Sequence, residues 1–188
     1  MALISTTTGN VYQQTKRDFD SGIPPSDSEL LSETDLFTIF WKELRQKIFT
    51  AGNNDCRLLL DAYTSIYTGN TGWANGLTFV EHGACLQEVA DIIQDHPPDV
   101  IIHDVGDVYG YHRREPDRWK YICISKQWIN EWRQAMGFKP DRRLALGLEA
   151  VIRATLVHEL AHWLFTLVSS LAYNLPFFWN FILFSHPP

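Results

Sequence analysis

The segment "TLVHELAHWL", Thr155 to Leu164, constrains this chain more than any other stretch. His158 and His162 stand four residues apart, and Glu159, which follows the first of them, is the only charged residue in the segment. Residues i and i+4 of an α-helix lie on one face, one turn apart, so both imidazoles can reach the same ion. Because neutral imidazole is a good zinc ligand, the segment predicts a helix that holds Zn2+ through these two histidines.

The position of Glu159 predicts a catalytic role beside that ion. Successive helical residues emerge about 100° apart around the axis, so the carboxylate lies next to the ion rather than on it. There it can accept a proton from metal-activated water, which is the logic of the H-E-x-x-H motif. The alternative is an apolar helix that happens to carry two core histidines. The uncharged surroundings favour the metal site, because a buried metal helix excludes stray charges.

The same ten residues resemble the signature of the zincin metallopeptidases. Thr155 stands three positions before the first histidine, and uncharged residues lie between and after the two histidines. The resemblance implies a zinc-dependent peptidase in which His158 and His162 are ligands and Glu159 activates water. It also implies a peptide or protein substrate that pairs through its backbone with the edge strand of a small sheet. We take "WKYICIS", residues 119–125, as the candidate edge strand. The resemblance does not identify a subfamily.

The third zinc ligand is the part of this site that the sequence leaves open. A catalytic zinc needs three protein ligands and an open position. In zincins the third ligand lies downstream of the helix, where this chain has no Asp, Glu or Cys and only His186. Four upstream histidines could approach the site in space: His82, His96, His103 and His112. We therefore expect an incomplete or inactive metallopeptidase domain over residues 34–167, followed by an apolar tail at 168–188 for which a retained intron is one hypothesis.

The uncharged tail leaves two other functions open. Trp163–Phe184 comprises 22 residues without a charge, which reaches the length of a transmembrane helix. Asn174, Pro176, Asn180 and the lack of flanking basic residues argue against such a span. The alternatives to a peptidase are a non-catalytic zincin-derived module that binds a peptide, and a tail-anchored membrane protein with a coincidental HExxH.

Charge and cysteine content exclude several other classes. A net charge of −6 argues against nucleic-acid binding through bulk electrostatics. The three cysteines, at 56, 85 and 123, form no CxxC pair, so neither a cysteine zinc cage nor a disulfide framework is expected. The first residues lack the apolar core of a signal peptide. These features favour an intracellular protein, in the cytoplasm or the nucleus, and leave its oligomeric state open.

The overall pattern predicts an α+β fold, with helices and a small mixed sheet ahead of the long HExxH helix. Residues 1–33 show no sustained apolar period, and we expect them to form a flexible N-terminal arm. The next helix presents an apolar face and should be capped by Ser32 or Thr34 and end at Gly52. Its expected inward-facing residues are Phe37, Phe40, Trp41, Leu44 and Ile48.

Further elements are expected along the rest of the chain. Helices should form at 56–67 and 84–94, with a short strand at 77–82 between them. Strands at 99–105 and 119–125 should form a hairpin with a long connection. A helix at 126–136 should end at Gly137, and the long helix from Arg142 should lose its period after Leu167.

Overall fold

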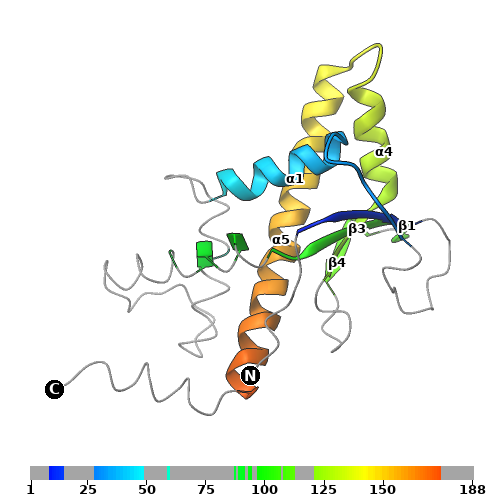
Figure 1. Cartoon of the computed structure of the whole chain (residues 1–188). Helices are drawn as coiled ribbons and strands as arrows, with labels where there is room; N and C mark the ends of the chain where they lie inside the picture. The colour runs from blue at the N-terminus through cyan, green and yellow to red at the C-terminus, as the bar shows by residue number, and fades with distance from the viewer. Residues whose placement is uncertain are drawn as a thin grey trace.

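The computed structural model describes residues 9–14, 28–48, 59, 87, 89–91, 93–94, 97–106, 108–112 and 121–174. Helices combine with a small mixed sheet of five strands, so the expected α+β class is confirmed (Figure 1). The strands are β1 (Val11–Gln14), β2 (Ser28–Leu30), β3 (Asp99–His103), β4 (Gly110–His112) and β5 (Tyr121–Ser125). The helices are α1 (Leu36–Lys47), α4 (Lys126–Ala135) and α5 (Arg142–Asn174).

The sheet has the strand order β2-β1-β3-β5-β4. The three inner strands β1, β3 and β5 run parallel, whereas β2 and β4 pair antiparallel at the two edges. Every residue of β3 is buried, because this strand lies at the centre of the sheet. The sequence "DVIIH" and the β-branched run of β5 therefore form strands where the pattern predicts them.

Two expectations about this sheet are wrong. β3 and β5 do not form a hairpin, because they are parallel neighbours in which Ile101 lies opposite Cys123. The segment between them contains β4, which runs antiparallel to β5 and takes the edge position. The expected edge strand, β5, is therefore an inner strand. β4 has only three residues and includes a glycine, so it shows no strand pattern of its own.

The expectation of a flexible arm over residues 1–33 is also wrong where β1 and β2 lie. β1 pairs with both β2 and β3, and the backbone N–H of Asn10 donates to Asp99 Oδ1 at 2.8 Å. The indole Nε1 of Trp41 donates to the carbonyl oxygen of Gly9 at 3.2 Å. These strands are three or four residues long and depend on partners distant in sequence, which a local apolar period does not reveal.

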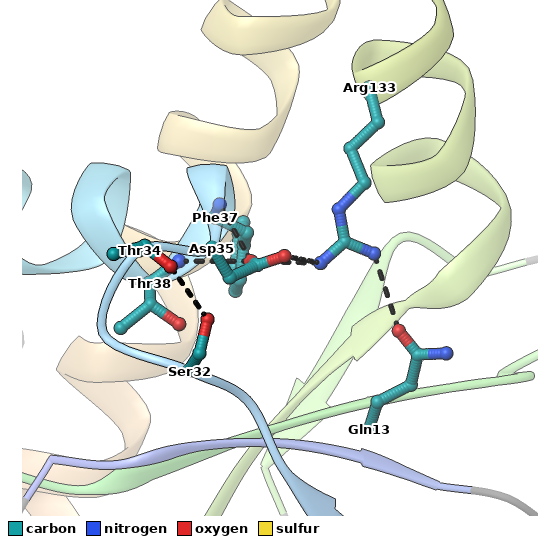
Figure 2. A network of polar contacts seen from close by, with 7 residues as sticks. All are labelled: Gln13, Ser32, Thr34, Asp35, Phe37, Thr38 and Arg133. Atoms are coloured by element: carbon teal, nitrogen blue, oxygen red, sulfur yellow. Dashed lines mark hydrogen bonds and ion pairs between the residues drawn. The ribbon is translucent and has the colours of Figure 1, made fainter.

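Helix α1 begins and ends differently from the expectation. Its N-cap is Asp35, whose Oδ1 accepts the backbone N–H groups of Phe37 and Thr38, whereas the hydroxyls of Ser32 and Thr34 contact each other (Figure 2). The helix ends at Lys47, before the expected Gly52. All but one of the residues predicted to face inward are buried: Phe37, Trp41, Leu44 and Ile48 are buried, and Phe40 is partly buried against the same core.

An ion pair joins the start of α1 to α4. Arg133 Nη2 donates to both carboxylate oxygens of Asp35, at 2.9 and 2.8 Å, and Arg133 Nη1 donates to Gln13 Oε1 at 3.3 Å (Figure 2). Both charged side chains are 21% exposed. One guanidinium therefore connects α4 with the cap of α1 and with strand β1.

Helices α4 and α5 form a hairpin, in which α4 lies alongside the first turns of α5 (Figure 1). Helix α5 also contacts β4 and β5. Its buried apolar residues join one core with those of the sheet: Ala145, Leu148, Ile152, Leu156, Val157, Leu160, Trp163, Leu164 and Leu167. The expected helix at 126–136 is confirmed as α4, within one residue of its predicted end.

Helix α5 continues to Asn174, beyond Leu167, after which the sequence shows no apolar period. Within the described part of the chain, no helix is long and apolar enough to cross a membrane. The strand expected at 77–82 lies outside the described residues, as does most of the helix expected at 56–67. Residues 87, 89–91 and 93–94 are helical, in agreement with the helix expected at 84–94.

Candidate metal and catalytic site on helix α5

The two histidines of the motif converge on one face of α5. The Nε2 atoms of His158 and His162 lie 3.0 Å apart, and the two rings meet edge to face with centroids 4.6 Å apart. His158 is exposed and His162 is half-buried. The i, i+4 spacing therefore brings both imidazoles to one point that solvent can reach, as the sequence predicts.

The apolar residues of the same helix explain why the histidines face outward. Leu156, Leu160 and Trp163 are each fully buried and recur at helical spacing. A residue two positions away emerges about 200° around the axis, so His158 lies nearly opposite Leu156. Burial of the Leu and Trp stripe thus fixes the rotation of the helix and turns the histidine pair away from the core.

Glu159 points in a different direction, towards strand β4. Glu159 is only 7% exposed, and the backbone of His112 lies near enough to its carboxyl to influence the pKa. Burial raises the pKa of Glu159 above the ordinary value of a carboxyl, while the positive charge of His158 and the His112 N–H oppose that rise. Glu159 thus lies on the side of α5 that faces the edge strand.

Strand β4 lies very close to α5 because Gly110 has no side chain. A Cβ at this position would lie 2.7 Å from both Thr155 Cγ2 and the carbonyl oxygen of Cys123. The same Cβ would lie 3.6 Å from Cγ of Glu159. The glycine therefore lets the edge strand approach the helix beside the candidate base.

His112 fastens the same strand to the helix through its ring. Its Nε2 lies 3.2 Å from Thr166 Oγ1, and its Nδ1 lies 3.1 Å from the carbonyl oxygen of Tyr121. Gly110 and His112 lie opposite the buried Ile124 and Ile122, so both face α5. The sequence indicates His112 only as a possible ligand. Its approach to Glu159 joins residues 47 positions apart, and no local pattern indicates it.

The remaining sequence candidates for a third ligand do not join the pair. His103 is 4% exposed, and its Nε2 lies 2.8 Å from the hydroxyl of Tyr111, a residue that alternates with those facing α5. His82, His96 and His186 lie outside the described residues. Among the residues that the structure describes, no group of three or more His, Cys, Asp or Glu side chains could hold a metal ion. His158 and His162 thus fit two zinc ligands, and the third is unassigned.

Comparison of the chain with protein-family models, with curated proteins and with solved structures finds no match. Function is therefore inferred from the geometry of the site itself.

Proposed function

We propose that this chain is a zincin-like domain that hydrolyses peptide bonds with the help of Zn2+, held by His158, His162 and a third ligand that is still unassigned. The observation that carries the proposal is the arrangement of three groups on one helix. Two imidazole nitrogens converge to 3.0 Å, and the intervening Glu159 is a buried carboxyl that faces an edge strand. If the two histidines were only structural residues of an apolar helix, they would not need the buried carboxyl of Glu159 beside them.

The bound ion would supply electrostatic polarisation of the scissile carbonyl and would lower the pKa of water. Glu159 is the general base: it accepts a proton from the attacking water and passes it to the leaving amine. Burial raises its pKa, which increases its affinity for that proton. The backbone N–H of His112, on strand β4, favours the ionised form of this carboxyl.

The substrate class follows from strand β4. As an edge strand, β4 pairs on one side with β5, and no other described strand pairs with its second side. An edge strand is the position at which an extended peptide can add to a sheet through backbone pairing. Because Glu159 lies against β4, a peptide bound there would pass the candidate base.

Zinc content after dialysis tests the proposal, with Glu149→Gln as a control on the same helix. We expect the native chain to retain zinc and the variants His158→Ala and His162→Ala to lose it. Glu159→Gln should retain zinc and lose peptide hydrolysis, whereas Glu149→Gln should keep both. Hydrolysis by Glu159→Gln at the native rate would contradict the role assigned to this carboxyl.

A second candidate function is a peptide-binding module that does not cut, supported by the edge position of β4 without reference to the metal. In that case dialysed protein would lose its zinc and still bind extended peptides. If a chelator abolishes peptide binding, and if hydrolysis returns when zinc is restored, the result instead favours the peptidase.

A further inference from the structure

The turn between α4 and α5 exposes an unusual number of apolar side chains. Phe138 is 99% exposed, and Leu146, Leu144 and Met136 are 65%, 50% and 46% exposed. We call these four residues, together with Lys139, Arg142 and Arg143, the hairpin tip. Exposed apolar residues scattered singly are normal, but a cluster of this kind on one protrusion marks a surface that meets something apolar.

The hairpin tip is also positively charged, in a chain of net charge −6. Lys139, Arg142 and Arg143 are all exposed, and Asp141 is the one carboxylate among them. Oδ1 of Asp141 accepts the backbone N–H groups of Arg143 and Leu144, at 3.1 and 3.0 Å, and so caps α5. Three exposed cations therefore lie within a few residues of the exposed apolar side chains, and their charge favours an anionic partner.

The directions of the apolar residues decide which anionic partner fits. Leu144 and Leu146 are two positions apart on α5 and emerge about 200° apart, while Phe138 lies in the turn before the helix. One rigid protein surface could cover only one of these sides. The hollow beside the tip, lined by Trp128, Leu144 and Val151 among others, would accept a side chain of a peptide but includes neither Phe138 nor Leu146. A deformable surface can contact Phe138, Leu144 and Leu146 at the same time.

We propose that the hairpin tip inserts into the headgroup layer of a membrane that contains anionic phospholipids. Phe138, Leu144 and Leu146 enter the apolar boundary, and Lys139, Arg142 and Arg143 pair with the phosphates. The tip lies at the end of the hairpin away from the sheet (Figure 1). From Arg142 to Glu159 the helix rises by about 25 Å, so the tip can bind lipid while the candidate active site stays in water. The inference does not depend on the proposed peptidase activity.

Co-sedimentation of the full chain with lipid vesicles tests this inference. We expect binding to vesicles that contain phosphatidylserine, little binding to phosphatidylcholine alone, and a loss of binding as the salt concentration rises. Replacing both arginines, in Arg142→Gln/Arg143→Gln, should weaken binding by roughly 25-fold, because each cation near an anionic surface contributes about fivefold. Phe138→Ser should also weaken it.

Two control variants separate the tip from general surface effects. Leu30→Ser removes another exposed apolar residue, 56% exposed, and Lys126→Gln removes a cation at the opposite end of α4. Both should bind vesicles as the native chain does, with unchanged melting temperatures for all variants. Equal binding to neutral and anionic vesicles, or native binding by the tip variants, would overturn the inference. The inference would also be overturned if the chain did not bind vesicles but self-associated through Phe138. That result would identify a second copy of the chain as the partner of the hairpin tip.

Discussion

His112 of strand β4 and Thr166 of helix α5 face each other across 3.2 Å, from Nε2 to Oγ1, and join the edge strand to the helix of the candidate site. Thr166 also donates its single hydroxyl proton to the carbonyl oxygen of His162, at 2.9 Å. Because a carbonyl oxygen only accepts, His112 Nδ1 donates to Tyr121, and Nε2 is the ring nitrogen that contacts the Thr166 hydroxyl. The link thus runs from the edge strand to the backbone of one candidate ligand.

Replacement of Thr166 by Val should loosen this link while keeping the volume of the side chain. We expect a loss of about 1–3 kcal/mol in the free energy of unfolding, because a partly buried ring nitrogen loses its partner. Urea denaturation measures the loss, and amide hydrogen exchange should show faster opening of β4.

Thr155→Val is the matched control for that change. Thr155 Oγ1 likewise donates to the carbonyl oxygen four residues earlier, at 2.9 Å, and its methyl group touches β4. Valine keeps the methyl group and removes only the bond within the helix, so we expect a change below about 0.5 kcal/mol. Equal losses in the two variants would show that the link to His112 contributes nothing.

The buried Glu159 makes stability depend on pH in a defined direction. Its pKa is raised in the folded chain, so the folded state binds the proton more tightly than the unfolded state does. Below a pH of about 4.3, the pKa of a glutamate in the unfolded chain, Glu159 is protonated in both states and does not lower the free energy of unfolding. As the pH rises through the folded pKa, ionisation of the buried group lowers the free energy of unfolding.

Glu159→Gln should therefore stabilise the metal-free chain at neutral pH, and the gain should vanish in acid. Melting temperatures from pH 4 to 8, measured with chelator present, check this difference against Glu149→Gln, which lies on the same helix. A gain that stays constant down to acid pH would point to packing rather than to ionisation of Glu159.

Local sequence patterns predict those parts of the fold that are determined by residues close together in the chain. The apolar period predicts α4 and α5, and the i, i+4 spacing predicts the convergence of His158 with His162, because helix geometry alone determines both. The β-branched runs similarly predict β3 and β5.

Other parts depend on partners far along the chain, and no local pattern reveals them. β4 is a strand because β5 pairs with it, and the contact of Glu159 with His112 exists because Gly110 admits the helix. Asp35 prevails as the cap of α1 over Ser32 and Thr34 because it also pairs with Arg133, 98 positions later. The sequence shows each of these residues but not which of them meet.

Gly110→Ala should separate β4 from the helix. A Cβ at 2.7 Å from a backbone oxygen and from a helix side chain cannot be accommodated without movement, so we expect a loss of about 1–3 kcal/mol. Gly147→Ala, in the same helix α5, is the opposite case, because its Cβ would meet nothing within 4 Å. That change should stabilise by about 0.5–1 kcal/mol. Chemical denaturation of both variants checks the contrast, and a stabilising Gly110→Ala would show that β4 has room to move.

The ion pair of Asp35 with Arg133 should contribute measurably to the stability of the fold. Asp35→Asn keeps a side-chain oxygen that can cap α1 but removes the negative charge, and Arg133→Met removes the cation but keeps an extended side chain. Because Arg133 Nη2 reaches both carboxylate oxygens and the two side chains are only 21% exposed, we expect a coupling energy of about 1 kcal/mol, at the upper end for surface pairs. A double-mutant cycle built from urea unfolding of the four proteins measures it.

The coupling energy between Asp35 and Arg133 should decrease at high salt, because the pair is partly open to solvent. Lys47→Met with Glu43→Gln is the comparison, because that pair lies on one exposed helix face, and its side chains are 65% and 55% exposed. It should give no more than about 0.5 kcal/mol. If the coupling energy between Asp35 and Arg133 were as small as that of Lys47 with Glu43, apolar packing would hold α4 to α1. That packing includes Phe40 and Trp132, whose ring centroids lie 5.6 Å apart.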